Sequence, residues 1–364
     1  MPAYSQAHRP LRVTTPLGED VLLLAALHGV EGVSMPFELQ LSLLSEDPAV
    51  SAADLLRKPV TVALRLADES ERTLHGLIRR FVQQGRAEEL TAYQAEVVPW
   101  LWFLSLSHES RIYQNLTTLE IVEQVFRDRG FADFESRCSR AYPAREFCVQ
   151  YRETHLDFVS RLLEEEGIFY FFEHTADRHL LVLADSSSAV QPCPEMPRAR
   201  MAPQAVEGGE EVVTSLHLEE SAVTGKVVLK DYDFLQPSLR LESATSAAYP
   251  EEFYDYPGEF AAPDEGERRA RIRLEAAGAL RQVIRGQSTC RAFASGFRFD
   301  LAEHPRPDAN QAYMLLQLQH SASAGDFRSS GGAALGYRNQ FVAIPHTVPF
   351  RPPPVTPHPV VQGS

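Results

Sequence analysis

The chain has 364 residues and a mass of 40.7 kDa, which at about 100–200 residues per domain allows two or three domains. Hydrophobic residues make up 44% of it, so a large core can form and wholesale disorder is excluded. There are 49 acidic and 35 basic residues, and the resulting charge of −14 argues against a surface built to grip nucleic-acid phosphates.

Residues 12–105 have the alternating pattern of half-buried strands. Apolar side chains alternate with mostly polar ones in two runs, at Phe37, Leu39, Leu41 and Leu43, and at Val60, Val62, Leu64 and Leu66. Short strands at this spacing, separated by glycine, proline and acidic turns, are typical of a barrel or sandwich. We therefore predict a first β-rich domain, a barrel or a sandwich, over this range.

The apolar run Val21–Leu27 is far shorter than the roughly 20 residues that a helix needs to cross a bilayer. Glu19 and Asp20 precede it, where a signal peptide needs positive charge. We predict a strand here, and neither a signal peptide nor a transmembrane helix.

Residues 106–211 form a helix-containing middle region. Two residue pairs have the spacing of a helix cap, and a glycine suited to end a helix follows each of them: Thr117 with Glu120 before Gly130, and Thr154 with Asp157 before Gly167. We predict one helix between each pair and its glycine.

The second predicted helix ends on three glutamates, Glu164, Glu165 and Glu166, whose charges oppose the helix dipole. Some other contact must favour them, and we expect a solvated face or a polar contact with another chain. Beyond them, residues 168–183 predict a hairpin, and the proline- and serine-rich residues 185–211 predict a long exposed loop.

Residues 212–345 are predicted to form a second β-rich domain with a helix over residues 265–284. Asp264 and Glu267 have capping spacing, and five apolar residues are expected to face inward: Ala270, Leu274, Ala277, Leu280 and Ile284. The expected strands include Val227–Leu229, Phe293–Phe299 and Tyr313–Leu318. Residues 346–364 are proline-rich and read as a semi-rigid linker.

The four cysteines, Cys138, Cys148, Cys193 and Cys290, contain no C-x-x-C pair and match no zinc spacing. They are too few for a disulfide scaffold, so we predict free thiols in a chain that folds in the cytosol.

His174, Asp177 and His179 lie close together and are residue types that bind metals. They fall in the predicted hairpin loop and no fourth ligand is indicated, so a solvated turn is the favoured interpretation. His108-Glu109 lacks the second histidine of H-E-x-x-H.

The other motifs also favour structural interpretations. The glycines near Ser330-Gly331-Gly332 and Gly336 lack the lysine of a phosphate loop. Acidic residues surround Arg268, Arg269, Arg271 and Arg273, which favours ion pairs within the helix or between chains. We predict no catalytic residue, no metal ligand and no cofactor-binding residue, and no nucleic-acid partner.

The run Tyr151–Phe171, YRETHLDFVSRLLEEEGIFYF, closely resembles the VgrG family of type VI secretion spike proteins. Further segments resemble the family in the same order along the chain: Tyr256–Glu259, Tyr337–Phe341, Ala343–Pro345, Pro349–Pro353 and Pro357–Gly363. The resemblance spans essentially the whole chain.

This resemblance implies an α+β, mainly β fold like the baseplate hub of contractile phage tails. It implies two related β-barrel domains with helical insertions in a homotrimer, and a chain truncated before the OB-fold and β-helical needle of the family. Three chains with two similar barrels each would present six similar units to a six-fold tube. The expected function is therefore a hub that adapts the Hcp tube to a three-fold spike and serves effector delivery.

The same resemblance implies several partners: Hcp, baseplate components, effectors or adaptors and, only through the absent needle, a PAAR-type tip protein. It implies assembly in the cytoplasm and translocation into a target cell. Two alternatives stay open. One is an effector enzyme such as a cell-wall hydrolase, using Glu166 or His174. The other is an adaptor or effector-docking module that uses residues 185–211.

Overall fold

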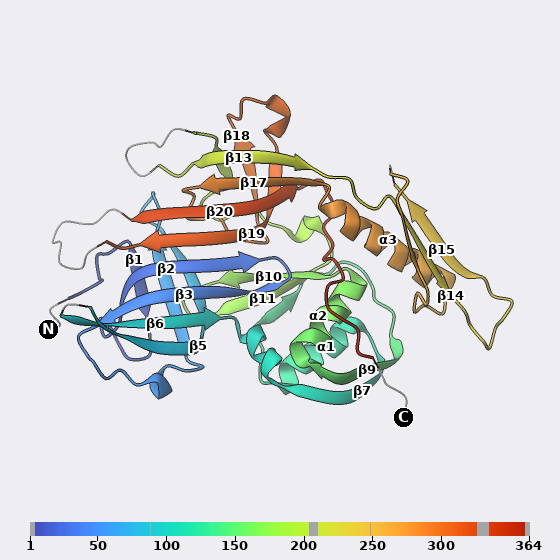
Figure 1. The fold of residues 1–364 in the computed structure, drawn as a ribbon, viewed down its shortest axis with the longest axis horizontal. Coiled ribbons are helices and arrows are strands. Elements are labelled where there is room, and N and C mark those ends of the chain that lie inside the picture. The colour runs from blue at the N-terminus through green and yellow to red at the C-terminus, as the bar shows by residue number, and fades with distance from the viewer. Residues whose placement is uncertain (1–3, 88, 204–209, 248, 326–334, 361–364) are drawn as a thin grey trace.

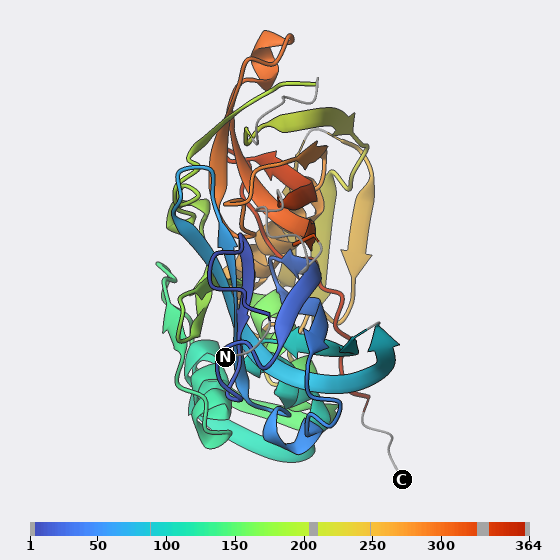
Figure 2. The ribbon, with the colours of Figure 1, turned by 90° about the vertical axis from the view of Figure 1, so that its left-hand side faces the viewer.

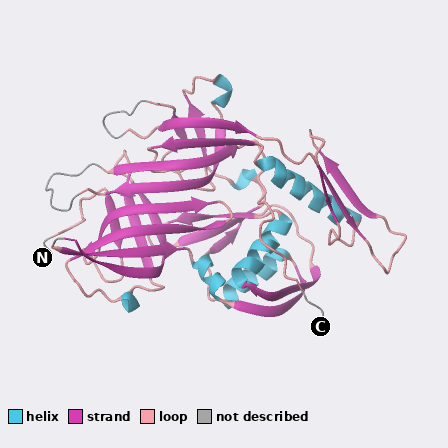
Figure 3. Cartoon of the chain, in the orientation of Figure 1, coloured by secondary structure: helices cyan, strands magenta, loops and turns pink. Residues whose placement is uncertain are grey.

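The computed structural model describes residues 4–360 except 88, 204–209, 248 and 326–334. Strands dominate it, and the α-helices gather beside one end of a large sheet (Figure 3). The main strand order of this sheet is β1-β4-β5-β6-β3-β2-β19-β20-β17-β13, with β12 and β18 attached at β19. The prediction of a mainly β chain is confirmed.

The first half of the chain supplies one side of the sheet. Its strands are β1 (Leu11–Thr14), β2 (Leu23–Gly32), β3 (Met35–Ser45), β4 (Pro59–Arg65), β5 (Glu71–Ala87) and β6 (Leu90–Val98). The alternating residues Phe37, Leu39, Leu41 and Leu43 lie on β3 and are at most 2% exposed. The run Val21–Leu27 enters β2, as predicted.

The second half supplies the other side, and Figure 2 shows the two halves one above the other. Its strands are β12 (Arg198–Arg200), β13 (Val213–Glu220), β17 (Gln282–Ser288), β18 (Arg298–Ala302), β19 (Ala312–Ser323) and β20 (Gly336–Pro345). The predicted strand Tyr313–Leu318 lies in β19, whereas most of Phe293–Phe299 is a turn-rich loop before β18.

The two halves are joined where β2 and β19 pair antiparallel, from Gly32 opposite Gln317 to Ala26 opposite Ser323. Among the described strands the order has two ends, so the halves share one open sheet and do not form two separate closed barrels. The alternating sequence pattern marks half-buried strands, but it does not identify which strands pair.

The middle region packs against one end of the sheet (Figure 1). It contains the helices α1 (Thr118–Asp128) and α2 (His155–Glu166), and the strands β7 (His108–Leu116), β8 (Phe134–Ser136), β9 (Arg145–Thr154), β10 (Phe169–His174) and β11 (His179–Ala184). Both predicted caps are confirmed. The Thr117 hydroxyl accepts from the Glu120 amide, and Thr154 accepts from the Asp157 amide. The predicted hairpin is β10–β11.

Four short 3-10 helices complete these regions: η1 (Ala52–Asp54), η2 (Trp100–Leu106), η3 (Ser187–Ala189) and η4 (Pro307–Ala309). The segment 185–211 was predicted to be an exposed loop, but its described part is largely packed onto the body. The body is the name used here for the described residues between 4 and 345, other than residues 221–281. Val190, Cys193 and Ala199 are at most 3% exposed, and β12 pairs with β18. Proline limits regular backbone hydrogen bonding in this segment, but it does not prevent side chains of the segment from being buried.

A small module, here called the arm, is inserted between β13 and β17 and comprises residues 221–281. It contains β14 (Lys226–Asp231), β15 (Leu241–Ser246), β16 (Glu252–Asp255) and α3 (Pro263–Ala279). It has its own small core of Val227, Leu229, Leu241, Phe260 and Ala270.

The predicted boundaries of helix 265–284 were wrong. Helix α3 begins at Pro263 after Ala262, with no side-chain cap, and ends at Ala279. Ile284 belongs to β17, and Leu280 is 45% exposed. The prediction is too long because Leu280 and Ile284 continue the apolar spacing of the helix after it has ended.

The four cysteines are free thiols, as predicted. Within the described residues, no helix is long and apolar enough to span a membrane.

Candidate functional site

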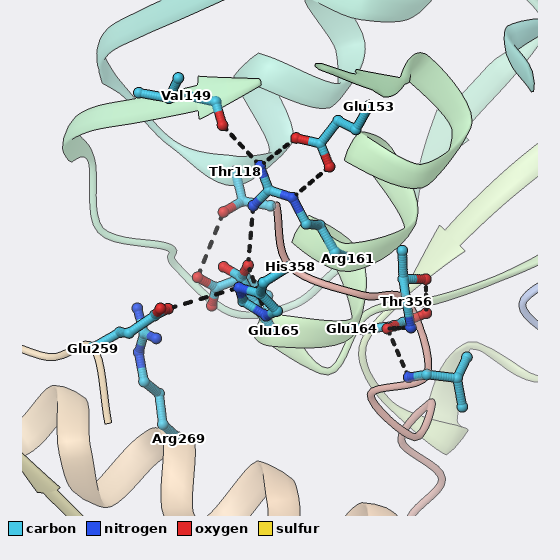
Figure 4. A network of polar contacts seen from close by, with 12 residues as sticks. Thr118, Val149, Glu153, Arg161, Glu164, Glu165, Glu259, Arg269, Thr356 and His358 are labelled. Atoms are coloured by element: carbon cyan, nitrogen blue, oxygen red, sulfur yellow. Dashed lines mark hydrogen bonds and ion pairs between the residues drawn. The ribbon is translucent and has the colours of Figure 1, made fainter. Parts of the chain in front are cut away.

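The three glutamates at the end of α2 lie at a junction between the body, the arm and the C-terminal segment 346–360. The last turn of α2 has no basic residue of its own. Each carboxylate instead meets partners from other parts of the chain, and Figure 4 shows the contacts of Glu164 with Thr356 and of Glu165 with Arg161 and His358. The expectation of a solvated face is therefore wrong.

Glu166 is 3% exposed and pairs with two arginines. Arg145 at the start of β9 donates to its Oε1 at 3.0 Å. Arg268 on α3 forms an ion pair with its Oε2. A buried carboxylate is tolerated only where opposite charge and hydrogen bonds compensate its lost hydration. Glu166 therefore links the body to the arm.

Glu165 belongs to a second set of pairs within the body. Arg145 donates to its Oε2 at 2.6 Å, and Arg161 on α2 lies 3.4 Å from its Oε1. Arg161 also donates to both oxygens of Glu153, at 2.7 and 2.8 Å, and to the Val149 carbonyl. This chain of charges ties α2 to β9.

Glu164 holds the C-terminal segment. Its Oε2 accepts from the backbone N–H groups of Val355 and Thr356 at 3.0 and 2.9 Å, and its Oε1 accepts from the Thr356 hydroxyl at 2.7 Å. His358 lies 3.9 Å from Glu165 and 4.0 Å from Glu259 of the arm. The proline-rich segment is thus bound to the body at Val355 and Thr356.

Burial acts on the pKa values of both Glu164 and Glu165, but the partners of these two carboxylates differ. Burial alone would raise the pKa of Glu165, yet the guanidinium of Arg145, with Arg161, holds it below its ordinary value. Burial raises the pKa of Glu164 because its partners are neutral N–H and O–H groups rather than an adjacent cation.

The predicted histidines are brought together with a third, His75 on β5. His174 and His179 are directly opposite in the β10–β11 hairpin, and His179 Nδ1 lies 2.9 Å from His75 Nδ1. His179 Nε2 accepts from the Trp100 N–H at 2.9 Å. The neutral His179 ring therefore carries its proton on Nδ1 and donates it to His75.

The histidines are not in a solvated turn, although Asp177 is exposed. His179 is 3% exposed, and burial lowers its pKa to about 2 and that of His174 to about 4. Protein groups already occupy both ring nitrogens of His179, and no metal-binding cluster is found in the described part of the chain. The three rings pack the hairpin onto the sheet.

A second buried network lies where the two sheet halves meet. Glu31 on β2 accepts from Arg72 on β5 at 2.6 Å and contacts His320 Nε2 on β19 at 2.8 Å. His320 Nδ1 lies 2.8 Å from the Tyr337 hydroxyl on β20. These residues are far apart along the chain and match no motif, so the sequence alone does not predict the network.

The remaining motifs fall in different places. Of the arginines of α3, Arg269 pairs with Glu265 one turn away, as predicted for pairs within the helix. Arg268 and Arg273 instead pair with other elements of the same chain, with Glu166 and Asp255. Ser330-Gly331-Gly332 lies outside the described residues, and Gly336 begins β20. The only hint of the charged junction in the sequence was the run of glutamates opposing the dipole of α2.

Comparison with known proteins identifies this arrangement. Residues 30–325 match the family described as phage tail baseplate hub (GPD). The chain is 38% identical over 371 residues to the type VI secretion system spike protein VgrG1b of Pseudomonas aeruginosa, covering 99% of this chain and 50% of that protein.

The chain belongs to the VgrG family of type VI secretion spike proteins. VgrG1a of Pseudomonas aeruginosa is 37% identical over 365 residues, covering 98% of this chain and 57% of that protein. The chain thus spans about half the length of these relatives. A relative named as an actin cross-linking toxin, VgrG1 of Vibrio cholerae, is 30% identical over 365 residues, which make up 95% of this chain and 33% of the toxin.

Solved structures agree on the fold. The Escherichia coli c3393 protein is described as a type VI secretion component with structural similarity to the T4 bacteriophage tail proteins gp27 and gp5. It superposes with a TM-score of 0.72 at 24% identity, covering 97% of this chain and 82% of that one. The 43 kDa tail protein of prophage MuSo2 from Shewanella oneidensis gives 0.62 at 9% identity, covering 93% and 99%. This chain, the c3393 protein and the prophage tail protein therefore share one fold.

Proposed function

We propose that this chain forms the base of a VgrG spike, the part that comes before the OB-fold and needle of the family. The base acts as a structural hub of the type VI secretion apparatus. Three copies form a homotrimer between the Hcp tube and the spike, and the assembly serves effector delivery. The family match along nearly the whole chain carries this proposal.

The sheet supports a symmetry-adapting role. Each chain contributes two sheet halves joined at β2 and β19, so three chains present six halves around one axis. Such a ring meets a six-fold tube on one side and a three-fold spike on the other. The domain ranges 12–105, 106–211, 212–345 and 346–364 remain our proposed division of the chain.

Binding to the tube is testable directly. The purified chain is mixed with Hcp hexamers and treated with an amine-reactive cross-linker, and the products are resolved by mass. The hub role predicts a cross-linked product that contains both proteins. Only self-products, at Hcp concentrations where tubes form, would argue against it.

We propose that the role is structural rather than enzymatic. The hydrolase candidates have structural partners: Glu166 is bound by two arginines, and His174 packs against Phe37 with ring centroids 5.0 Å apart. Peptidoglycan and ester substrates are expected to remain intact with the wild-type chain. Turnover that Glu166→Gln or His174→Asn abolishes would overturn this.

We also propose assembly in the cytoplasm, contact with baseplate components, and translocation with effectors or their adaptors. Docking through residues 185–211 is not favoured, because the described part of that segment packs onto the body. A PAAR-type tip protein would bind through a β-helical needle, and we propose no contact between it and these 364 residues.

A further inference from the structure

The arm is attached to the body covalently at one narrow place. Its two ends leave the sheet side by side, where Glu220 of β13 is paired with Gln282 of β17. Just beyond, the Ser221 N–H donates to the Arg281 carbonyl at 2.9 Å. A module with its own core and one narrow attachment can rotate unless other contacts hold it.

The end of α2 contacts the arm directly. Arg268 forms an ion pair with Glu166. Ile272 packs on Gly167, where a Cβ added to the glycine would lie 2.8 Å from Ile272 Cγ2. Glycine thus allows α3 to approach the end of α2 closely.

The C-terminal segment 346–360 also contacts the arm. In Figure 1 it runs from the end of β20 past α3 and α2. Arg351 donates to Glu275 on α3 at 2.8 Å, and on the body side to the carbonyls of Gly167 (3.2 Å) and Asp185. One guanidinium therefore bridges the arm and two points of the body.

The same segment is fixed to the body on both sides of Arg351. Phe350 is 6% exposed and packs edge-to-face on Phe169, with ring centroids 5.5 Å apart. Glu164 holds Val355 and Thr356. Between these anchors, Pro352 and Pro354 line a small hollow of about 40 Å³ together with Leu229, Gly258 and Ala276 of the arm.

We propose that the C-terminal segment 346–360 is a strap that holds the arm against the body. With the strap in place the arm is docked. When the contact between Arg351 and Glu275 is lost, the other contacts hold the arm less firmly, and the arm undocks more often as an intact module about its attachment at Glu220 and Gln282. Any partner that draws the strap out of the junction would therefore free the arm. This goes beyond the proposed hub function and does not depend on it.

Thiol labelling in native conditions tests the strap. A cysteine at Ile272→Cys is covered by the body when the arm is docked, because Ile272 is 3% exposed and packs on Gly167. A cysteine at Ala270→Cys lies in the arm's own core and reports unfolding of the arm. Both are made in a Cys138→Ser background, because Cys138 is the partly exposed native thiol.

Each reporter is combined with Glu275→Ala, with Arg351→Met, or with the control Arg127→Met, which removes an exposed ion pair with Glu123 within α1. Loss of a charge-assisted hydrogen bond predicts about 10- to 100-fold faster labelling at position 272 in the two strap variants. Labelling at position 270, and all rates with the control, are expected to stay unchanged.

Two results would overturn the strap. Equal acceleration at positions 270 and 272 would mean that the arm unfolds rather than undocks. Unchanged labelling at 272 in both strap variants, with wild-type circular dichroism, would mean that the segment does not hold the arm. Because both readouts lie within one chain, their outcome is independent of binding to Hcp.

Discussion

Arg268 on α3 and Glu166 at the end of α2 form a buried ion pair, although 102 residues separate them in the sequence. Arg145 supplies the second cation for the same carboxylate. These two arginines compensate negative charge at the end of α2, where three acidic residues oppose the helix dipole. The junction between body and arm depends on these pairs.

Replacing Glu166 with alanine tests this dependence. The change leaves Arg145 and Arg268 without their shared partner in a buried place, so we expect a loss of about 3–5 kcal/mol in the free energy of unfolding. Urea unfolding followed by circular dichroism measures it. Arg306→Met, which removes only an exposed pair, is the control and should leave the midpoint unchanged. A loss for Glu166→Ala no larger than that of the control would contradict the account.

Gly167→Ala is expected to destabilise the fold more than Gly130→Ala. Both glycines have positive φ angles, +65° and +81°, so each substitution carries a backbone penalty of about 1 kcal/mol. Only at Gly167 would the new Cβ also meet Ile272 and Arg351, each at 2.8 Å, whereas nothing lies within 4 Å at Gly130. Equal unfolding midpoints for the two variants would show that the arm does not pack on the end of α2.

Arg72→Met is expected to weaken the joint between the sheet halves. Glu31 would remain buried beside His320 without its main cation, which predicts a loss of about 3–5 kcal/mol in unfolding free energy. Arg12→Met removes the more exposed pair with Glu71 and is expected to lose about 0–1 kcal/mol. Similar urea midpoints for the two variants would argue against a structural role of the buried network.

The histidine cluster predicts loss of stability in mild acid. Burial lowers the pKa of His174 to about 4, below the ordinary 6.5 of an unfolded histidine. The unfolded chain therefore binds more protons as the pH falls below 6.5, and the contribution to stability is fully present above that pH and is lost toward pH 4.

His174→Asn keeps a donor and an acceptor beside the backbone of His75 but does not titrate. Between pH 6.5 and 4 the unfolding free energy of this variant should fall less than that of wild type, by at most about 3 kcal/mol for the one group. Urea midpoints at several pH values measure this. Parallel pH profiles for wild type and variant would show that His174 does not contribute.

Local signals allowed prediction of the elements around α1 and α2, because Thr117, Thr154 and Gly167 act through contacts within a few residues. The pairing of β2 with β19 joins residues about 290 positions apart and leaves no local signature. The ion pairs of Arg72, Arg145 and Arg351 likewise leave no local signature, because the carboxylates that they pair with lie on other elements. Helix α3 was predicted too long because Leu280 and Ile284 continue its apolar spacing after the helix ends.

We propose that this chain is a subunit of a three-fold hub. Light scattering after size exclusion measures its mass in solution when the chain is loaded over a hundredfold range of concentration. A three-fold hub predicts a mass near three times 40.7 kDa at the upper concentrations, and a melting temperature that rises as more of the chain becomes trimeric. A mass of 40.7 kDa and a constant melting temperature throughout would contradict a trimer formed by the base itself.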